Sequence, residues 1–420
     1  MFQKFLDLES TERFWEIVKD KLDVKLQKKE KIKFHNSIKR VLAEDIQANE
    51  NLPAFNRSTV DGYAVKSQDI QGVSQSLPAY LELVGNVKMG EKTDIEIDDG
   101  QAAYIPTGGM MPKGADCVVM VEQTENISDD MVEIYKTAGV GENIIKKGEE
   151  IKKREVILKR GHRIKPRDMG VFAGLGITEF EVYKKPRVAI ISTGDELISP
   201  EKEMKFGEIR DINTYTITQL LSEVGAEVTQ AGIVEDTFEK IKAAIQKYLD
   251  FDLILVSGGS SAGLKDVTVD IINKLGNPGV LVHGLKVKPG KPTILGKIDN
   301  TPIMGLPGHP GSAWMITNKF VLPLVKLLSG EYKADNILKS IIENQITQSA
   351  VLNRNLSSDK GREEMVPVKL LKDKGKITAE PLLGKSSFMR VFIESDGYLV
   401  IEAAQEGIEK GQVIDIYLFH

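Results

Sequence analysis

The sequence contains very little cysteine and histidine. Cys117 is the only cysteine among 420 residues, and there are five histidines. A disulfide framework within one chain is therefore excluded, and a cysteine-based zinc site is not expected. Cys117 lies in the apolar run ADCVVMVE. It is interpreted as a small hydrophobic residue of a buried strand.

Long hydrophobic runs and an excess of one charge are also absent. No segment approaches the ~20 consecutive apolar residues of a membrane-spanning helix, and the N-terminus lacks the apolar stretch of a secretory signal. The net charge is −5, with lysines and acidic residues interleaved. A nucleic-acid binder would instead show a basic face or tail. These absences predict a cytoplasmic protein that binds neither membranes nor nucleic acids, and any bound anion must be held by a local group of residues.

The length and the changing sequence pattern predict several domains. A chain of 420 residues exceeds one ordinary hydrophobic core. Residues 10–22 are predicted to form an amphipathic helix, because apolar residues recur every four positions from Phe14 to Leu22. Residues from about 50 to 180 carry short apolar runs between clusters of glycine, aspartate and asparagine. That pattern is typical of β-hairpins and small barrels.

Apolar runs alternate with helical periodicity from residue 186 onward. Helices are predicted near 213–224, 236–249, 266–275 and 312–328, and strands at RVAIIST, AEVTQAGIV, DLILVSG, VLVHGL and TPIMGLPG. This alternation indicates βαβ units and a mostly parallel sheet with helices on both faces. Ligands of such sheets bind beyond the carboxyl ends of the strands. After about residue 331 strand patterns return and predict a small C-terminal β-domain.

The loop TGDEL (193–197) follows the first of these strands. Gly194 allows a sharp turn of the backbone, and Asp195 and Glu196 place adjacent carboxylates at the sheet edge. Considered alone, the loop is more simply explained by Asp195 capping a helix.

Two further strands run into glycine-rich loops. GGSSAGLKD (258–266) can cradle a phosphate at the start of a helix, where Asp266 stands, although a flexible connector would have the same composition. GLPGHPGSA (305–313) precedes a helix whose expected N-cap is Ser312. His309 in this loop is interpreted as a surface or packing residue.

The segment KVKPGKPT (286–293) concentrates positive charge. Lys286, Lys288 and Lys291 fall within six residues, and two prolines restrict the backbone between and beside them. A solvated run of charges does not require prolines around a glycine. We therefore interpret the segment as an anion site.

Three turns lie upstream of the sheet. PAFNRSTVDGYAV contains Asp61, IPTGGMMPKGADCVV contains Thr107, and KKGEEI contains Glu150. Each by itself is an ordinary β-turn. Taken in order with STGDEL, GGSSAG, VKPGKPT and GLPGHPGSA, they resemble the molybdopterin molybdenumtransferase family, the MoeA proteins, whose eukaryotic counterpart is the E domain of gephyrin. The resemblance covers nearly the whole chain.

The resemblance implies an α/β plus β fold, multidomain and elongated. A MogA-like doubly wound, mostly parallel sheet domain would carry inserted β modules and a C-terminal small β-barrel domain. The implied parts are an N-terminal helix packing on the sheet domain (1–26), a linking module (27–47 and 148–183), an inserted β module (48–147), a molybdopterin-binding α/β domain (184–330) and a C-terminal β-domain (331–420).

The resemblance also implies a transferase that inserts molybdate into adenylylated molybdopterin and releases AMP, with Mg²⁺ as the accompanying ion. The family forms homodimers, and its active site lies between the sheet domain of one subunit and the inserted module of the other. The molybdopterin adenylyltransferase is the implied further partner. Tungstate is an alternative substrate, because several variants look like those of the archaeal and anaerobic branch.

The family's site residues carry over onto matching positions of this chain. The catalytic group is Asp61, Glu196, Asp266 and Glu150, of which the first three would hold the metal. The contacts to adenylylated molybdopterin are Thr107, Gly194, Asp195, Gly258, Gly259, Ser260, Ser261, Pro307 and Gly308. The molybdate contacts are Lys288, Lys291, Pro292, Ser312, Arg362 (in GREE) and Ser386 (in GKSS).

Some positions depart from the family pattern. Glu150 stands where the family usually has aspartate, Gly263-Leu264-Lys265 replaces a more acidic stretch before Asp266, and GHPGSA replaces the commoner GNPVSA. Two other functions compete with the transferase. A molybdopterin adenylyltransferase shares the sheet domain but lacks the inserted module and the C-terminal domain. A pterin carrier or clustering scaffold would not need the three carboxylates.

Overall fold

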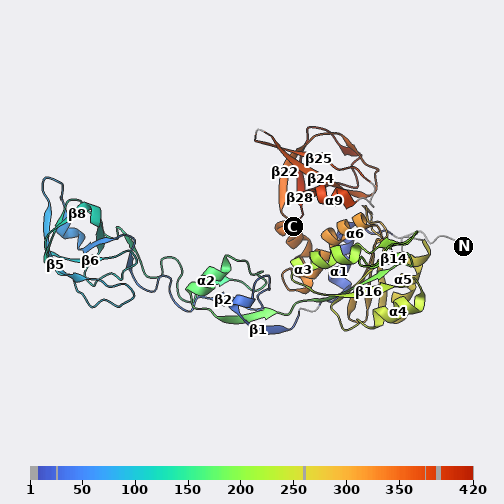
Figure 1. Ribbon diagram of the computed structural model, residues 1–420, viewed down its shortest axis with the longest axis horizontal. Helices are drawn as coiled ribbons and strands as arrows, with labels where there is room; N and C mark the ends of the chain where they lie inside the picture. Colours follow the sequence, from blue (N-terminus) through green and yellow to red (C-terminus); the bar gives the residue numbers. More distant parts are fainter. Residues whose placement is uncertain (1–7, 25–26, 259–261, 374, 385–388, 420) are drawn as a thin grey trace.

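The computed structural model describes residues 8–24, 27–258, 262–373, 375–384 and 389–419, with the side chains of 262–266 also outside the described part. The molecule is elongated (Figure 1). The inserted module forms one end, the linking module lies in the middle, and the sheet domain forms the other end with the C-terminal domain beside it. Among the described residues, no helix is long and apolar enough to cross a membrane.

The sheet domain contains a six-stranded mixed sheet. In spatial order its strands are β16 (Glu227–Val234), β13 (Arg187–Thr193), β17 (Leu253–Gly258), β21 (Thr301–Leu306), β20 (Ile294–Ile298) and β18 (Pro278–His283). The first four are mutually parallel, and β20 and β18 pair antiparallel. The predicted mostly parallel sheet is therefore confirmed, with β20 as a strand that was not predicted.

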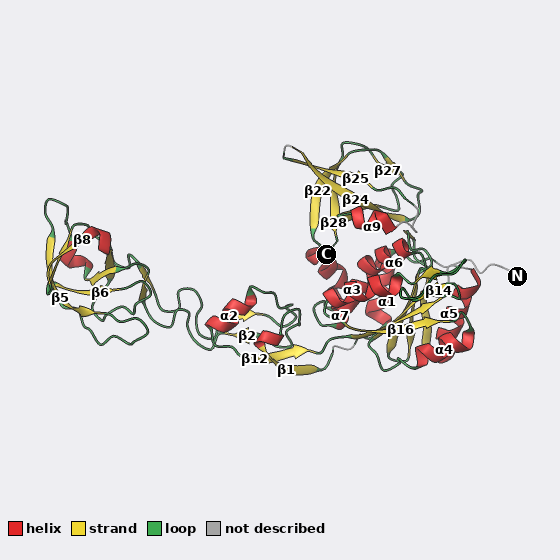
Figure 2. Cartoon of the chain, viewed as in Figure 1, coloured by secondary structure: helices red, strands yellow, loops and turns green. Residues whose placement is uncertain are grey.

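Helices cover both faces of this sheet, and Figure 2 shows that most of the helices in the molecule gather here. One face is covered by α1 (Thr11–Lys21), α3 (Asn213–Glu223), α6 (Pro310–Ile316) and α7 (Leu322–Leu328), and the other by α4 (Phe238–Gln246) and α5 (Ala262–Leu275). The Ser10 side chain accepts a hydrogen bond from the Arg13 N–H and caps α1. The Phe14 ring packs against Phe320 at 4.9 Å, so α1 belongs to the sheet domain's core.

Two helix starts differ from the prediction. The helix expected at 312–328 begins at Pro310, with His309 at the N-cap position, and a π-helical turn at Thr317–Val321 separates α6 from α7. The expectation of Ser312 as N-cap was wrong, because proline is favoured in the first helical turn. Helix α5 begins at Ala262, so Asp266 lies in its second turn rather than in the preceding loop.

The linking module is a small β-structure between the two ends of the molecule. It consists of β1 (Lys29–Lys33) paired with β12 (Glu179–Tyr183), β2 (Ile46–Gln47) paired with β11 (Val156–Leu158), and α2 (Asp168–Gly174). Arg163 of this module donates hydrogen bonds from Nε and Nη2 to Oε2 of Glu331, at 2.8 and 2.6 Å. Glu331 follows the C-terminal end of α7. This half-buried ion pair attaches the linking module to the sheet domain.

The inserted module contains a second six-stranded sheet. Its order is β7 (Cys117–Met120), β4 (Gly62–Val65), β6 (Gln101–Ile105), β5 (Ala79–Asn86), β9 (Met131–Ile134) and β8 (Thr124–Ser128). The short strands β3 (Arg57–Ser58) and β10 (Ile144–Ile145) pair at its base. Cys117 is fully buried in the core, and burial raises the pKa of its thiol to about 12. The interpretation of Cys117 as a core hydrophobe is confirmed.

The C-terminal domain is a closed barrel of five strands. The strands are β22 (Thr347–Leu352), β24 (Glu363–Asp373), β25 (Lys376–Pro381), β26 (Gly397–Ile401) and β28 (Val413–Leu418), and the pairing of β24 with β26 closes the barrel. Helix α9 (Met389–Glu394) and the pair β23 (Leu356–Ser357) and β27 (Gly407–Ile408) complete the domain. Helix α8 (Ile337–Asn344) leads into the barrel and packs its buried Ile337 and Ile341 in the core of the sheet domain. The two-residue strand β19 (Val287–Lys288) of the sheet domain adds to β24 in parallel, so the two domains share a sheet.

Candidate active site

A cleft lies at the carboxyl edge of the parallel strands. Strands β13, β17 and β21 are neighbours, so the loops that follow them meet at one edge of the sheet. The cleft has a volume of about 450 Å³. Its lining consists of Ser192, Thr193, Glu196, Leu197, Met204, Ile209, Arg210, Asp211, Ile212, Asn213, Ser257, Gly258, Gly308, His309 and Pro310. The small strands β14 (Leu197–Ile198) and β15 (Ile209–Arg210) form one wall.

Close backbone contact at this edge requires glycine. Gly258 has φ of +149°, and a Cβ atom there would lie 2.2 Å from the carbonyl oxygen of Thr193. Any other residue would therefore separate the ends of β13 and β17. Gly194 is similarly restricted, because its Cβ would lie 2.9 Å from Leu197 Cγ. These two glycines bring the TGDEL loop against the end of β17.

Carboxylates gather on one side of this edge. Asp195 and Glu196 are exposed, and Asp195 Oδ1 accepts the backbone N–H of Asp236 at 3.1 Å. Asp236 follows β16, and its Oδ1 is buried without a hydrogen-bond partner. Burial raises the pKa of Asp236, the charges of Asp195 and Glu196 raise it further, and a hydrogen bond from Thr193 acts in the opposite direction. The structure therefore adds Asp236 to the candidate site.

The floor of the cleft is held by buried polar contacts. Asn213 Nδ2 donates to Ser257 Oγ at 2.8 Å and to the Gly308 carbonyl at 3.0 Å. A hydrogen bond of 2.7 Å joins the hydroxyls of Ser192 and Thr214. Asn213 thus ties the start of α3 to β17 and to the loop after β21. Sequence reasoning missed Asn213, although an asparagine at the start of a helix that follows the TGDEL segment was a usable signal.

Six of the predicted site residues lie at this edge of the sheet: Gly194, Asp195, Glu196, Gly258, Pro307 and Gly308. Pro307 is buried immediately after β21. His309, predicted as a surface or packing residue, is exposed and lines the cleft. Gly259, Ser260 and Ser261 lie outside the described residues, and the same holds for the side chain of Asp266.

A second cavity, of about 280 Å³, lies between the sheet domain and the C-terminal domain. It is lined by Lys288, Pro289, Gly311, Met315, Glu364, Met365, Val366, Pro367, Leu382, Leu383, Gly384, Val391 and Phe392. Lys288 Nζ lies 2.9 Å from Glu364 Oε1, and the two residues face each other in the pairing of β19 with β24. Apart from this ion pair the lining is mostly apolar.

Some of the predicted molybdate contacts lie around this second cavity. Lys291 and Pro292 follow Lys288 in the same turn, and Lys291 is exposed. Ser312 is buried in the first turn of α6, next to the lining residue Gly311. Arg362 directly precedes β24, and its Nη2 lies 3.9 Å from Asp359. Ser386 lies outside the described residues.

Asp61 and Thr107 lie together in the inserted module. The Thr107 N–H donates to Asp61 Oδ1 at 2.8 Å, and both residues are exposed. Gly62 is required beside them, because its Cβ would lie 1.9 Å from the Val119 carbonyl oxygen. The exposed Glu150 lies in the segment that joins the inserted module to the linking module. Within one chain the inserted module, with Asp61 and Thr107, is at the opposite end of the molecule from the sheet domain that contains the cleft (Figure 1).

The single chain therefore presents two separate parts of the predicted site. Asp61, Thr107 and Glu150 are not brought to Glu196. Over the ranges that the structure describes, no group of three or more histidine, cysteine, aspartate or glutamate residues is arranged to hold a metal ion.

Comparison with known proteins gives matches along nearly the whole chain. The MoeA N-terminal region (domain I and II) matches residues 9–176, a probable molybdopterin binding domain matches residues 189–327, and the MoeA C-terminal region (domain IV) matches residues 349–419.

Individual relatives agree with these matches. A protein of Methanocaldococcus jannaschii whose name places it in molybdopterin biosynthesis is 35% identical, over 100% of this chain and 99% of its own. The molybdopterin molybdenumtransferase of Haemophilus influenzae is 32% identical, over 93% of this chain and 94% of its own. A solved structure of the molybdopterin biosynthesis MoeA protein from Pyrococcus horikoshii is 33% identical, covers 99% of this chain and 100% of that one, and superimposes with a TM-score of 0.81. The chain therefore belongs to the MoeA family of molybdopterin molybdenumtransferases and is a transferase of molybdenum cofactor biosynthesis.

Proposed function

We propose that this transferase inserts molybdate into adenylylated molybdopterin and releases AMP. The observation that carries the proposal is a pair of adjoining cavities of different size. Gly308, His309 and Pro310 line the cleft, and the next residue, Gly311, lines the smaller cavity together with Lys288. A large organic phosphate ester and a small tetrahedral anion can therefore be held on the two sides of one segment.

The larger cleft suits a pterin linked to a nucleotide. Asn213 and Thr193 offer polar groups at its floor, and Ile209 and Ile212 offer apolar surface. Ligand sites commonly combine apolar walls with a few fixed polar groups that orient the ligand. A flat heterocycle can lie on the apolar wall while its phosphates face the glycine-rich strand ends.

The smaller cavity suits molybdate because molybdate is a tetrahedral dianion. Lysine ammonium groups and an arginine fork form charge-assisted hydrogen bonds to such oxyanions. Lys288 and Lys291 lie in one turn, and Ser312 lies in the first turn of the adjacent helix α6. Arg362 directly precedes the strand that pairs with this turn. We propose these four residues as the oxyanion-binding group, and we retain Pro292 and Ser386 as proposed members of it.

The carboxylates at this edge of the sheet are oxygen ligands of the kind that a hard divalent cation takes. Asp236 has a buried oxygen without a hydrogen-bond partner, and Asp195 and Glu196 lie close enough to raise its pKa. Mg²⁺ takes oxygen ligands and often shares them with substrate phosphates. We propose that Asp236, Glu196 and Asp266 hold Mg²⁺ together with Asp61 of the partner subunit. When bound, the ion would stabilise the negative charge on the departing AMP.

We propose a homodimer in which the inserted module of one subunit covers the cleft of the other. The proposal rests on the separation of Asp61 and Thr107 from Glu196 within one elongated chain. An exchanged arrangement of this kind is self-complementary, so two equivalent clefts form around a two-fold axis.

The dimer is expected to show complementation between two inactive variants. Light scattering should give twice the chain mass of 46.5 kDa. Asp61→Asn and Asp236→Asn should each be nearly inactive alone, because each removes one part of every cleft. Mixed subunits should recover about a quarter of the wild-type rate, since half of the dimers are mixed and each mixed dimer has one intact cleft. A fully active monomer, or no recovery in verified mixed dimers, contradicts a shared cleft.

The reaction itself is tested by AMP release. The protein is incubated with adenylylated molybdopterin, Mg²⁺ and either molybdate or tungstate. We expect AMP to appear only when an oxyanion is present, and the relative rates identify the metal that is used. A protein that instead forms adenylylated molybdopterin from ATP has the adenylyltransferase function, and one that binds the pterin without releasing AMP is a carrier.

We further propose that the reaction takes place in the cytoplasm. The one cysteine is buried, which suits a reducing compartment without requiring it. The adenylylated substrate would be supplied by a molybdopterin adenylyltransferase, which is the proposed further partner.

A further inference from the structure

The two side chains of the Lys288–Glu364 ion pair differ in their exposure to solvent. The Lys288 side chain is 45% exposed, whereas the Glu364 side chain is only 14% exposed, and their charged atoms are 2.9 Å apart. Glu364 is fixed from two sides, because it lies in strand β24 opposite Lys288 and accepts a hydrogen bond of 2.6 Å from Ser358 Oγ. The carboxylate is therefore a fixed group, and the lysine is the more exposed partner.

The neighbouring glutamate has a different partner. Glu363 forms a half-buried ion pair with Lys319 and accepts a hydrogen bond of 3.3 Å from Thr11 Oγ1. Successive residues of a strand point to opposite sides, so Glu363 and Glu364 face different surroundings. Glu363 joins the C-terminal domain to α1 and the π-helical turn, and Glu364 faces the cavity.

From this arrangement we infer that Glu364 competes with the oxyanion for Lys288 and so limits how tightly the site binds it. The inference rests on the proposed function, in which Lys288 binds molybdate. A carboxylate within hydrogen-bonding distance of that lysine repels an incoming dianion, and the surrounding lining is mostly apolar and screens the repulsion poorly. Arg362 and Lys291 are the other two cations of the proposed oxyanion-binding group.

This competition has a chemical consequence for the transfer. Molybdate must be captured and then given up to the dithiolene, and a site of unopposed cations would retain it. Glu364 can hold Lys288 again as soon as the anion leaves. The net charge of the two lysines, the arginine and the glutamate is +2, which matches the charge of one molybdate ion.

The test is calorimetric titration of two tetrahedral anions, molybdate and the monoanion perrhenate, into the full-length protein. Glu364→Gln keeps the shape and an oxygen that can accept from Ser358, and removes only the charge. It should bind molybdate about tenfold more tightly, and the gain for perrhenate should be smaller, because a dianion is repelled more than a monoanion. Glu364→Asp, which withdraws the carboxylate by one methylene, should show a smaller gain than Glu364→Gln.

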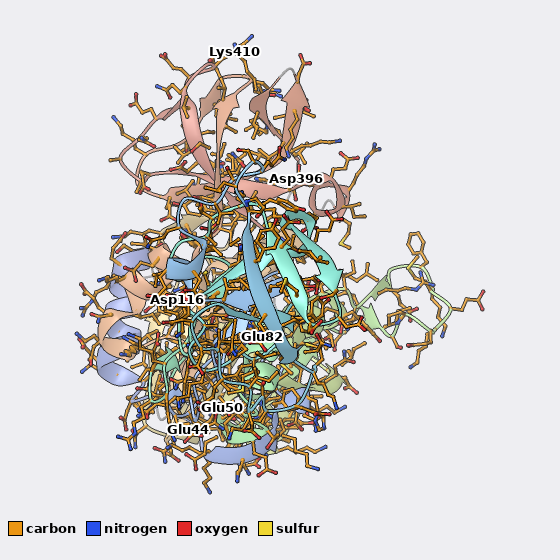
Figure 3. All side chains as sticks on the ribbon, turned by 90° about the vertical axis from the view of Figure 1, so that its left-hand side faces the viewer. Glu44, Glu50, Glu82, Asp116, Asp396 and Lys410 are labelled. Atoms are coloured by element: carbon orange, nitrogen blue, oxygen red, sulfur yellow. The ribbon has the colours of Figure 1, made fainter. Side chains whose placement is uncertain are left out.

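Glu409→Gln is the matched control. Glu409 is an exposed carboxylate of the same domain, and its neighbour Lys410 lies at the end of that domain far from the sheet domain (Figure 3). Glu409→Gln should leave the affinities for molybdate and for perrhenate unchanged. An unchanged or weakened molybdate affinity in Glu364→Gln, with a wild-type melting curve, overturns the competition and leaves Glu364 as a group that only positions Lys288. If Lys288→Ala binds molybdate as well as the wild type, the proposed oxyanion site itself is wrong.

Discussion

Replacing Asp236 by asparagine should lower the rate of AMP release by at least about 100-fold and at the same time raise the thermal stability of the protein at neutral pH. The loss is expected because Asp236, next to Asp195 at the carboxyl edge of the sheet, carries a buried carboxylate oxygen without a hydrogen-bond partner, and the proposed metal ion needs that charge. Asparagine keeps the size of the side chain. The gain in stability is expected because the charged form of Asp236 is disfavoured by burial and by the charges of Asp195 and Glu196.

The pH dependence of this gain has a defined sign. The pKa of Asp236 is raised in the folded protein, so folding favours the protonated form. Below the unfolded-state pKa of about 3.9, Asp236 is protonated in both states and its burial does not lower the free energy of unfolding. As the pH rises from there through the raised pKa of the folded state, the free energy of unfolding of the wild type falls. The melting temperatures of Asp236→Asn and the wild type should therefore differ most at neutral pH and converge toward pH ~4.

Magnesium provides a readout that does not depend on catalysis. Mg²⁺ should raise the melting temperature of the wild type more than that of Asp236→Asn, because only a ligand that binds the folded state stabilises it. Asp250→Asn is the control, since Asp250 pairs with Arg187 at the amino end of β13, the opposite edge of the sheet. A variant Asp236→Asn that releases AMP at the normal rate would exclude Asp236 from the metal site.

Lys288→Ala is expected to weaken the use of molybdate by about 10- to 150-fold, and to leave binding of the adenylylated pterin nearly unchanged. A charged hydrogen bond to a ligand contributes ~1.5–3 kcal/mol, which gives this range. The loss should fall near its upper end, because the substitution also leaves the carboxylate of Glu364 without its partner in a mostly apolar cavity. Lys291→Ala removes one cation from the same turn without freeing a carboxylate, so its loss should be smaller.

These effects are measured as the molybdate concentration that gives half-maximal AMP release, together with a direct titration of the adenylylated pterin. Lys274→Ala serves as the control, because Lys274 lies at the end of α5 over the ring of Phe238, on the other side of the sheet. Equal losses for both ligands would mean that Lys288 belongs to the pterin site. No loss for either ligand would remove the lysine–proline turn from the active site.

Several features were determined by the sequence alone. The helix behind Ser10, the strands that precede the three loops, the mostly parallel sheet and the C-terminal β-domain were all predicted and are present. Each of these depends on local periodicity, on a cap or on the alternation of strand and helix, and all of these act over a few residues. The order and content of the loops likewise carried the family resemblance, which the comparisons confirm.

The starts of α5 and α6 were less well predicted for the same reason. Glycine and serine in GGSSAG and two prolines in GLPGHPGS favour loops locally, yet helix α5 begins at Ala262 and α6 at Pro310. The later part of α5 packs on the sheet through Ile271 and Ile272, and α6 packs through Ala313 and Ile316. Most of the stability of a helix comes from such packing rather than from local propensity, so a local pattern does not place the first residue.

The tertiary structure alone decided which side chains meet. Asp236 comes next to Asp195 because β16 lies beside β13, and Glu364 comes opposite Lys288 because β19 pairs with β24 in one register. Neither pair has a local signal, since register and strand order depend on the packing of the whole sheet. The distance from Asp61 to Glu196 was also decided only by the fold, because the linking module holds the inserted module away from the sheet domain of its own chain.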